Sequence, residues 1–236
     1  MNGHTRRTSA VPRTSSGTVY MPPTKTYLGF DIYHGDSLPG TTWQDDFPYF
    51  QMAYKGGLYG VMMKASEGNS GVDPAFLGRM PVAQQAGLVV GAYHFFDAGV
   101  DPISQAKNFL AVTGGHFRWS ILDFEPSSAR PELDGDAVAF IQTVEASTGQ
   151  PCMLYTCRWD VVPGDAADGF LQQRPFWLAE YGMQPIPPDG WSDWTFWQCT
   201  DGNIGSSVIP VPGIGNVDRS WYAGTPQQFV DTYGGM

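Results

Sequence analysis

The segment WSILDFE, residues 119–125, has the pattern of a buried strand that ends in two acids. Side chains alternate between the faces of a strand, so Asp123 and Glu125 are predicted to point to the same side. Leu122 and Phe124 then face the other side, where a covering helix is expected. Two acids held side by side at a strand end repel each other and lose hydration, which favours a proton on one of them. Cleavage of a glycosidic bond requires such a protonated acid; the alternative is a solvated strand end whose acids cap the next helix.

The composition indicates a globular chain with an acidic surface. Its 236 residues suit one large domain or two small ones, and 13 basic against 23 acidic residues give a formal net charge of −10. This charge argues against nucleic acid and anionic membranes as partners, and no stretch approaches the roughly 18 unbroken apolar residues of a membrane span. The cysteines, Cys152, Cys157 and Cys199, are odd in number, and no Cys/His spacing resembles a zinc site. We expect neither a metal nor a cofactor.

Residues 1–26 differ in composition from the rest of the chain. They contain four basic residues, no acid and many Ser, Thr and Pro, but no apolar segment of the kind that a signal peptide has. This composition is typical of a flexible basic tail, and we favour a solvated leader over a tail that binds an anionic partner. Residues 27–236 contain no linker and no obvious repeat, and are predicted to form one domain.

Short apolar runs alternate with helix-like segments along this domain. The predicted strands are 27–32, 58–64, 88–95, 119–125, 151–156, 175–180 and 194–199, and the predicted helices between them are 43–55, 73–87, 101–113, 134–149 and 160–173. Strand, helix, strand at this pace predicts parallel strands with helical crossovers. After about residue 175 no helix is expected until 226–233, so we predict an α/β barrel whose closing strands have lost their helices. The alternative, an open doubly wound sheet, would need a Gly-rich phosphate turn that the sequence lacks.

Polar residues recur where the predicted strands end, and catalytic groups of a parallel barrel gather at those ends. They are Asp31, Lys64, Tyr93, Asp123 with Glu125, Tyr155, Glu180 with Tyr181, and a late Asp218. Lys64 either pairs with a barrel acid or contacts sugar. His94 is predicted to be a hydrogen-bonded core imidazole rather than a base. Of the many aromatic residues near the C-terminus, we place Trp177 and Tyr181 in a saccharide groove first, because flat rings stack on sugar faces.

Seven motifs in this order resemble glycoside hydrolase family 25, the Chalaropsis-type lysozymes or N-acetylmuramidases of phage endolysins and bacterial autolysins. They are GFDIY (29–33), KASEG (64–68), GAYHF (91–95), LDFE (122–125), WLAEY (177–181), WQ (197–198) and VD (217–218). The resemblance covers about residues 27 to 222. Ser66, Cys199 and the pair Arg219-Ser220 depart from the usual family pattern, but no departure removes a carboxylate.

The resemblance implies an irregular TIM-like (β/α)5β3 barrel and hydrolysis of the β-1,4 bond between N-acetylmuramic acid and N-acetylglucosamine. By position, Glu125 resembles the general acid of the family. Asp123 resembles its partner carboxylate, which stabilises the oxocarbenium-like state or assists the acetamido group of the substrate. Asp31 and Asp218 match two further acids of the cleft floor, beside which Tyr93, Tyr181, Trp177 and Lys64 are the remaining candidates for substrate contact.

We therefore expect an enzyme that acts as a monomer on bacterial peptidoglycan strands. Without a signal peptide it would be a phage-type lysin, held in the host cytoplasm until lysis or associated with a virion. Two alternatives stay open: a non-catalytic peptidoglycan-binding or virion-structural protein on the same barrel, and a chitinase-like hydrolase that also uses Asp-x-Glu.

Overall fold

The computed structural model describes residues 26–234, apart from positions 37, 41, 116, 128, 163–168, 183 and 206–207. The predicted tail lies outside this range, except for Thr26, which begins the first strand. None of the helices within the range has both the length and the apolar character to cross a membrane.

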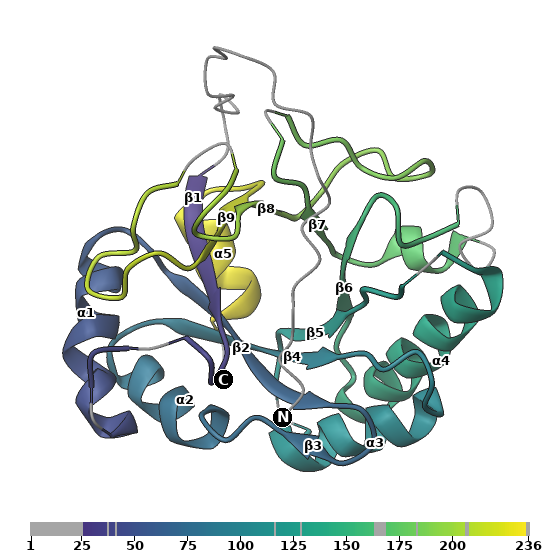
Figure 1. Cartoon of the computed structure of the whole chain (residues 1–236), viewed down its shortest axis with the longest axis horizontal. Helices are drawn as coiled ribbons and strands as arrows, with labels where there is room; N and C mark the ends of the chain where they lie inside the picture. The colour runs from purple at the N-terminus through teal and green to yellow at the C-terminus, as the bar shows by residue number, and fades with distance from the viewer. Residues whose placement is uncertain are drawn as a thin grey trace.

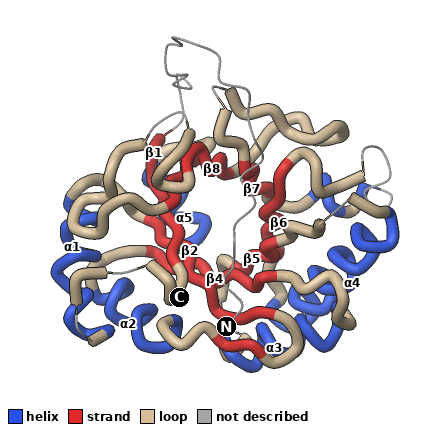
Figure 2. The backbone as a smooth tube through the Cα atoms, in the orientation of Figure 1, coloured by secondary structure: helices blue, strands red, loops and turns tan. Residues whose placement is uncertain are grey.

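Eight of the described strands close into a barrel (Figures 1 and 2). In spatial order they are β1 (Thr26–Ile32), β2 (Gly60–Glu67), β4 (Val89–Phe95), β5 (Ser120–Asp123), β6 (Cys152–Cys157), β7 (Phe176–Ala179), β8 (Phe196–Thr200) and β9 (Asp218–Tyr222). All neighbours pair in parallel except β9, which runs antiparallel to both β8 and β1 and closes the ring. A short strand, β3 (Gly71–Val72), forms a hairpin with β2. The predicted barrel is confirmed, and its last three strands follow one another without intervening α-helices among the described residues.

Helices cover the outside of the ring, as Figure 2 shows for α1 (Phe47–Lys55), α2 (Phe76–Gln85), α3 (Pro102–Thr113) and α4 (Pro131–Thr148). A 3₁₀ turn, η1 (Trp43–Asp46), precedes α1. The start of α3 shows how the sequence sets these boundaries: the Asp101 side chain accepts a hydrogen bond from Ser104 N at 2.7 Å, and Pro102 occupies the first turn. Gly114 and Gly149 end α3 and α4 with φ values of 71° and 68°, a left-handed conformation that glycine adopts at little cost.

The helix predicted over 160–173 is wrong in the part that is described. Residues 160–161 form a bend, and a short 3₁₀ turn, η3 (Leu171–Gln173), follows later. Gly169 has φ 81°, which no α-helix interior allows. The apolar spacing of the described part therefore does not reflect helical periodicity.

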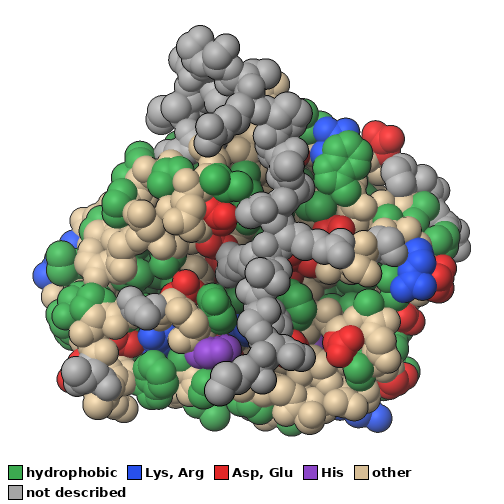
Figure 3. All heavy atoms as spheres, viewed as in Figure 1, with side chains coloured by type: hydrophobic (Ala, Val, Ile, Leu, Met, Phe, Trp, Pro, Cys, Tyr) green, Lys and Arg blue, Asp and Glu red, His purple; other side chains and the backbone are tan. Residues whose placement is uncertain are grey.

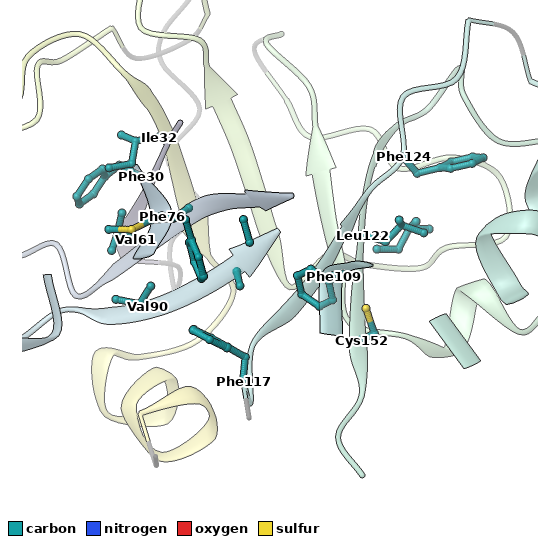
Figure 4. Close-up of a cluster of buried hydrophobic side chains, with 14 of the residues drawn as sticks. Phe30, Ile32, Val61, Phe76, Val90, Phe109, Phe117, Leu122, Phe124 and Cys152 are labelled. Atoms are coloured by element: carbon teal, nitrogen blue, oxygen red, sulfur yellow. The ribbon is translucent and has the colours of Figure 1, made fainter. Parts of the chain in front are cut away.

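Strand alternation divides the core into two parts. Leu122 and Phe124 point outward and pack with α-helical residues such as Phe109 and Phe140, as predicted (Figure 4). Trp119 and Ile121 belong to a second cluster inside the barrel. Both clusters are almost completely buried, so the barrel is a packed core rather than a pore.

The amino-terminal end of the barrel is closed by α5 (Pro226–Tyr233), which Figure 1 shows against the ring of strands. Phe229 and Tyr233 of α5 stack around Trp119, with ring centroids 5.3 Å and 5.2 Å away. Gly60 and Gly91, at or near the starts of β2 and β4, leave room for the indole: a Cβ on Gly91 would lie 2.7 Å from a Trp119 ring atom. Aromatic side chains thus fill the barrel interior at its amino-terminal end. The polar strand-end residues lie at the opposite end.

Gly91→Ala should lower the free energy of unfolding by about 1–3 kcal/mol, because the added methyl overpacks the barrel against Trp119. Chemical denaturation followed by Trp fluorescence measures the change. Gly135→Ala is the matched control: Gly135 is an exposed residue inside α4 with open space around its Cβ position, so the same substitution should stabilise the protein by about 0.5–1 kcal/mol. Equal effects of both substitutions would contradict the close contact inside the barrel.

Candidate active site

The barrel end that is formed by the carboxyl ends of the parallel strands, and by the start of antiparallel β9, carries one layer of inward-facing polar side chains. Asp123 follows Ile121 by two residues and Gln198 follows Phe196 by two, so each shares the face of a barrel-interior residue. The layer comprises Asp31 (β1), Lys64 (β2), Tyr93 (β4), Asp123 (β5), Tyr155 (β6), Gln198 (β8) and Asp218 (β9), all less than a tenth exposed. Acidic side chains are also visible near the centre of the face shown in Figure 3. The predicted convergence of strand-end residues is what the structure shows.

The side chain of Gln198 connects four members of this site. Its Nε2 donates to Asp31 Oδ1 at 2.9 Å and to Asp218 Oδ2 at 3.0 Å. Its Oε1 accepts from the hydroxyls of Tyr155 at 2.8 Å and Tyr181 at 2.9 Å. Because the two tyrosine hydroxyls donate to the oxygen, the amide nitrogen has to face the two acids.

The position of Gln198 offsets the repulsion between Asp31 and Asp218. Asp31 and Asp218 are directly opposite each other on β1 and β9, where two like charges destabilise a sheet. The shared N–H donor lies between the two carboxylates and stabilises their ionised forms. Gln198 therefore gives both buried acids a hydrogen-bond donor.

Tyr155 lies at the centre of the same group of charges. Burial raises the pKa of Tyr155 well above its usual value, and the neighbouring Glu125, Tyr181, Asp123 and Asp31 raise the pKa further. The Tyr155 hydroxyl therefore keeps its proton and acts as a donor to Gln198.

Asp123 and Glu125 differ in exposure. Asp123 is buried at the end of β5, whereas Glu125 is half-buried in the loop that follows. Phe124 N donates to Tyr155 O at 2.9 Å, so pairing with β6 continues past the end of β5. Asp123 and Glu125 both raise the pKa of Tyr155, so both carboxyl groups lie near its hydroxyl.

The structure also locates the other predicted residues. Trp177 is only 2% exposed, stands edge-on to Tyr155 with centroids 4.5 Å apart, and donates from Nε1 to Ser220 Oγ at 3.0 Å. It lies inside the barrel, and its stacking on sugar stays a prediction. Lys64 Nζ forms an ion pair with Glu67 Oε2 at 2.6 Å, which is the first of the two roles foreseen for it.

Two features of the site were missed from the sequence. Gln198 was noted only as part of a motif, although a single amide in an apolar strand, two residues after Phe196, is a signal for a buried hydrogen-bonding group. Trp159, in the loop after β6, is 64% exposed and carries the Arg158 guanidinium 4.3 Å above its ring. This ring is an aromatic surface that the rim presents to solvent, whereas Trp177 is buried.

His94 is buried next to the polar layer, and its predicted role as a core imidazole is confirmed. Nδ1 lies 2.8 Å from Ser66 Oγ, Nε2 lies 3.2 Å from Gln105 Oε1, and the ring stacks on Phe140. Burial lowers the pKa of His94 to about 4; the bond to Gln105 opposes the shift and the charge of Lys64 adds to it. Within the described ranges, no three His, Cys, Asp or Glu side chains are grouped as metal ligands.

Known proteins resemble this chain over most of its length. The family model of glycosyl hydrolases family 25 matches residues 41–208. Lysozyme M1 of Streptomyces globisporus is 26% identical over 86% of this chain and 69% of its own length. The N,O-diacetylmuramidase of Arthroderma benhamiae is 32% identical over 64% of this chain and 71% of its own. Among solved structures, the bacterial lysozyme of Streptomyces coelicolor superposes with a TM-score of 0.69 at 25% identity, over 88% of this chain and 97% of its own.

Gln198→Leu should lower the free energy of unfolding by about 2–4 kcal/mol, since it removes hydrogen bonds to two buried carboxyl groups and two tyrosine hydroxyls. Urea denaturation at neutral pH measures the change. Gln85→Leu makes the same replacement on the exposed surface of α2 and should stay within about 0.5 kcal/mol of wild type. A Gln198→Leu protein as stable as the control would show that the amide does not balance the two acids.

His94 should make the protein less stable as the pH falls from about 6.5 to about 4. The folded pKa is lowered to about 4, so in this window the unfolded chain binds more protons than the folded one, and stability falls by up to about 1.4 kcal/mol per pH unit. Above pH 6.5 the contribution is constant. Denaturation of wild type and His94→Gln at several pH values isolates the effect, and parallel stability curves for the two proteins would refute it.

Proposed function

The chain belongs to glycosyl hydrolases family 25, and from this membership and the acid layer we propose that it hydrolyses the β-1,4 bond between N-acetylmuramic acid and N-acetylglucosamine in peptidoglycan. It is a glycoside hydrolase of the lysozyme type. The observation that carries the specific proposal is the pair Asp123 and Glu125 at the open end of the barrel, one buried and one half-exposed. The names of the relatives, lysozyme and N,O-diacetylmuramidase, support peptidoglycan as substrate and muramic acid as the sugar whose bond is cleaved.

In the proposed mechanism, Glu125 is the general acid. As the more exposed of the two carboxyl groups, it can reach the glycosidic oxygen and donate a proton while the bond to the anomeric carbon breaks. Asp123, fixed at the end of β5, offsets the positive charge that develops at the anomeric carbon or orients the acetamido group that attacks it.

Asp31 and Asp218 contribute a fixed negative field below the reacting sugar. Their carboxylates are held by Gln198 before substrate binds, so no reorganisation is needed when the oxocarbenium-like charge forms. Tyr155 and Tyr181 orient the amide that holds them. The two tyrosines and Gln198 are therefore positioning residues in this proposal.

Glycan strands of a bacterial cell wall are the proposed partner, with the exposed ring of Trp159 available to stack on a sugar at the rim. Action as a monomer, and origin as a phage-type lysin held in the host cytoplasm or carried by a virion, stay predictions from the sequence.

Glu125→Gln should lower turnover of peptidoglycan by about 10²–10⁴-fold or more, because the amide cannot donate the required proton, while folding is unchanged. The assay is mass spectrometry of borohydride-reduced fragments after incubation with purified cell walls. Wild type should generate new reduced N-acetylmuramic acid ends. Glu132→Gln, an exposed change in the first turn of α4, is the matched control and should retain wild-type activity.

Other outcomes have definite meanings. Reduced N-acetylglucosamine ends would keep the hydrolase but overturn the bond specificity. Near-native activity of Glu125→Gln would remove Glu125 from the acid role. Binding to several cell walls without new ends would replace the proposal with a non-catalytic wall-recognition protein.

A further inference from the structure

A pocket of about 280 Å³, here named the lateral pocket, opens beside the acid layer. Its walls come from three neighbouring segments: His34 after β1, residues 64 and 67–73 at the end of β2 and in the hairpin to β3, and Asp97 with Val100 after β4. Lys64 belongs to both the pocket and the acid layer, so the two adjoin each other at this side chain. Figure 1 shows β3 projecting next to α3, away from β6, β7 and β8.

The hairpin wall of the lateral pocket is fixed before any ligand binds. Asn108 of α3 donates to Gly68 O at 3.1 Å and to Gly71 O at 3.0 Å. Asp73 N donates to Ala65 O at 2.9 Å, which holds the end of the hairpin to β2. A pre-formed site of this kind loses little conformational entropy on binding.

The opposite wall is braced just as firmly. The guanidinium of Arg79 donates to Tyr33 O and Asp36 O, both at 3.1 Å, and pairs with the buried carboxylate of Asp46 at 3.0 Å. These bonds fix the backbone on either side of His34.

His34 is the best-oriented polar group of the lateral pocket. Asp73 Oδ2 accepts from His34 N at 3.0 Å and contacts Nδ1 at 2.7 Å. The Asp73 side chain is 1% exposed, whereas the His34 side chain is 50% exposed. A carboxylate that only accepts places a proton on Nδ1 and leaves Nε2 as the nitrogen that a ligand can reach.

The side chains that line the lateral pocket indicate which chemical class of ligand it can hold. None of the described residues that line the pocket is Phe, Tyr or Trp, the large flat rings on which sugars stack. The lining combines the Lys64–Glu67 ion pair, the imidazole of His34 and the carboxyl group of Asp73 with the methyl groups of Val72 and Val100. Its volume lies just below the roughly 300–1,000 Å³ of small-molecule sites, enough for one or two amino-acid residues.

We propose that the lateral pocket binds the first residues of the peptide stem that muramic acid carries on its lactyl group. This inference rests on the proposed function, because only a substrate that contains muramic acid carries such a stem next to the cleaved bond. A sugar at the acid layer has to direct this substituent out of the cleft, and the lateral pocket adjoins the layer at Lys64. Peptide amides and carboxylates can form hydrogen bonds or ion pairs with His34 and Lys64. The alanyl methyl group of a stem can pack against Val72 and Val100.

The direct test is titration calorimetry of the full chain with N-acetylmuramoyl-L-alanyl-D-isoglutamine and with N-acetylmuramic acid alone. Wild type should bind the dipeptide conjugate at least about tenfold more tightly, a difference of about 1.4 kcal/mol. Val72→Trp, which fills the pocket from the half-exposed Val72, should reduce the ratio to about one. Val230→Trp, on an exposed position of α5 at the other end of the barrel, is the matched control and should keep the wild-type ratio.

A second measurement compares kcat/KM on intact strands with kcat/KM on strands whose stems an amidase has removed. Wild type should prefer intact strands, and both Val72→Trp and His34→Ala should reduce that preference. Equal affinity for the two small ligands, or a preference that neither variant changes, overturns the inference. A loss of binding to long peptide-free glycans in Val72→Trp also overturns it, since the pocket would then be a sugar subsite. If no strand is cleaved, the proposed function fails, and the calorimetric ratio still decides the pocket.

Discussion

The amide of Gln198, placed between Asp31 and Asp218, is the interaction on which the open end of this barrel depends. Closure of the ring by an antiparallel β9 brings the two aspartates into direct register. Without a shared donor, two buried like charges would favour protonation of one of them or separation of the strands. The amide can serve both acids only because Tyr155 and Tyr181 hold its oxygen. The hydrogen bonds of Gln198 therefore serve both the closure of the ring and the electrostatics of the cleft.

The two ends of the barrel have opposite character for a physical reason. At the amino-terminal end, Trp119, Phe229 and Tyr233 fill the space that Gly60 and Gly91 leave open. At the carboxyl end, inward-facing positions carry acids and hydroxyls, and Gln198 hydrogen-bonds four of them. A rigid, packed base lets this polar layer keep its geometry without substrate, which is the condition for electrostatic stabilisation of a transition state. The braced walls of the lateral pocket extend the same rigidity to the side of the cleft.

Period-two alternation predicted the strands well, because each barrel strand contributes one face to the interior cluster and the other to the outer cluster. It placed Leu122 outside and Asp123 inside, and it placed polar groups at the strand ends. Helical spacing gave a wrong prediction over 160–173, where residues 160–161 form a bend and Gly169 adopts a left-handed conformation. The burial of Trp177 was also not visible from its motif, since a strand aromatic has the same sequence context whether it faces a groove or a core. Gln198 was overlooked because its hydrogen-bond partners are distant along the chain, so no local sequence pattern indicates them.

The sequence by itself determined the class of fold, the order of the strands and the set of residues at their carboxyl ends, because these follow from local periodicity and from the ordered motifs. It also identified Asp123 and Glu125 as a pair, since the two are adjacent on one strand face. Only the tertiary structure decided which acid is buried, which amide balances Asp31 and Asp218, which tryptophan faces solvent, and that a polar pocket opens next to Lys64. Those features depend on contacts such as that of Gln198 with Asp31, which are 167 residues apart along the chain. Closure of the whole ring sets the distance in space between such residues.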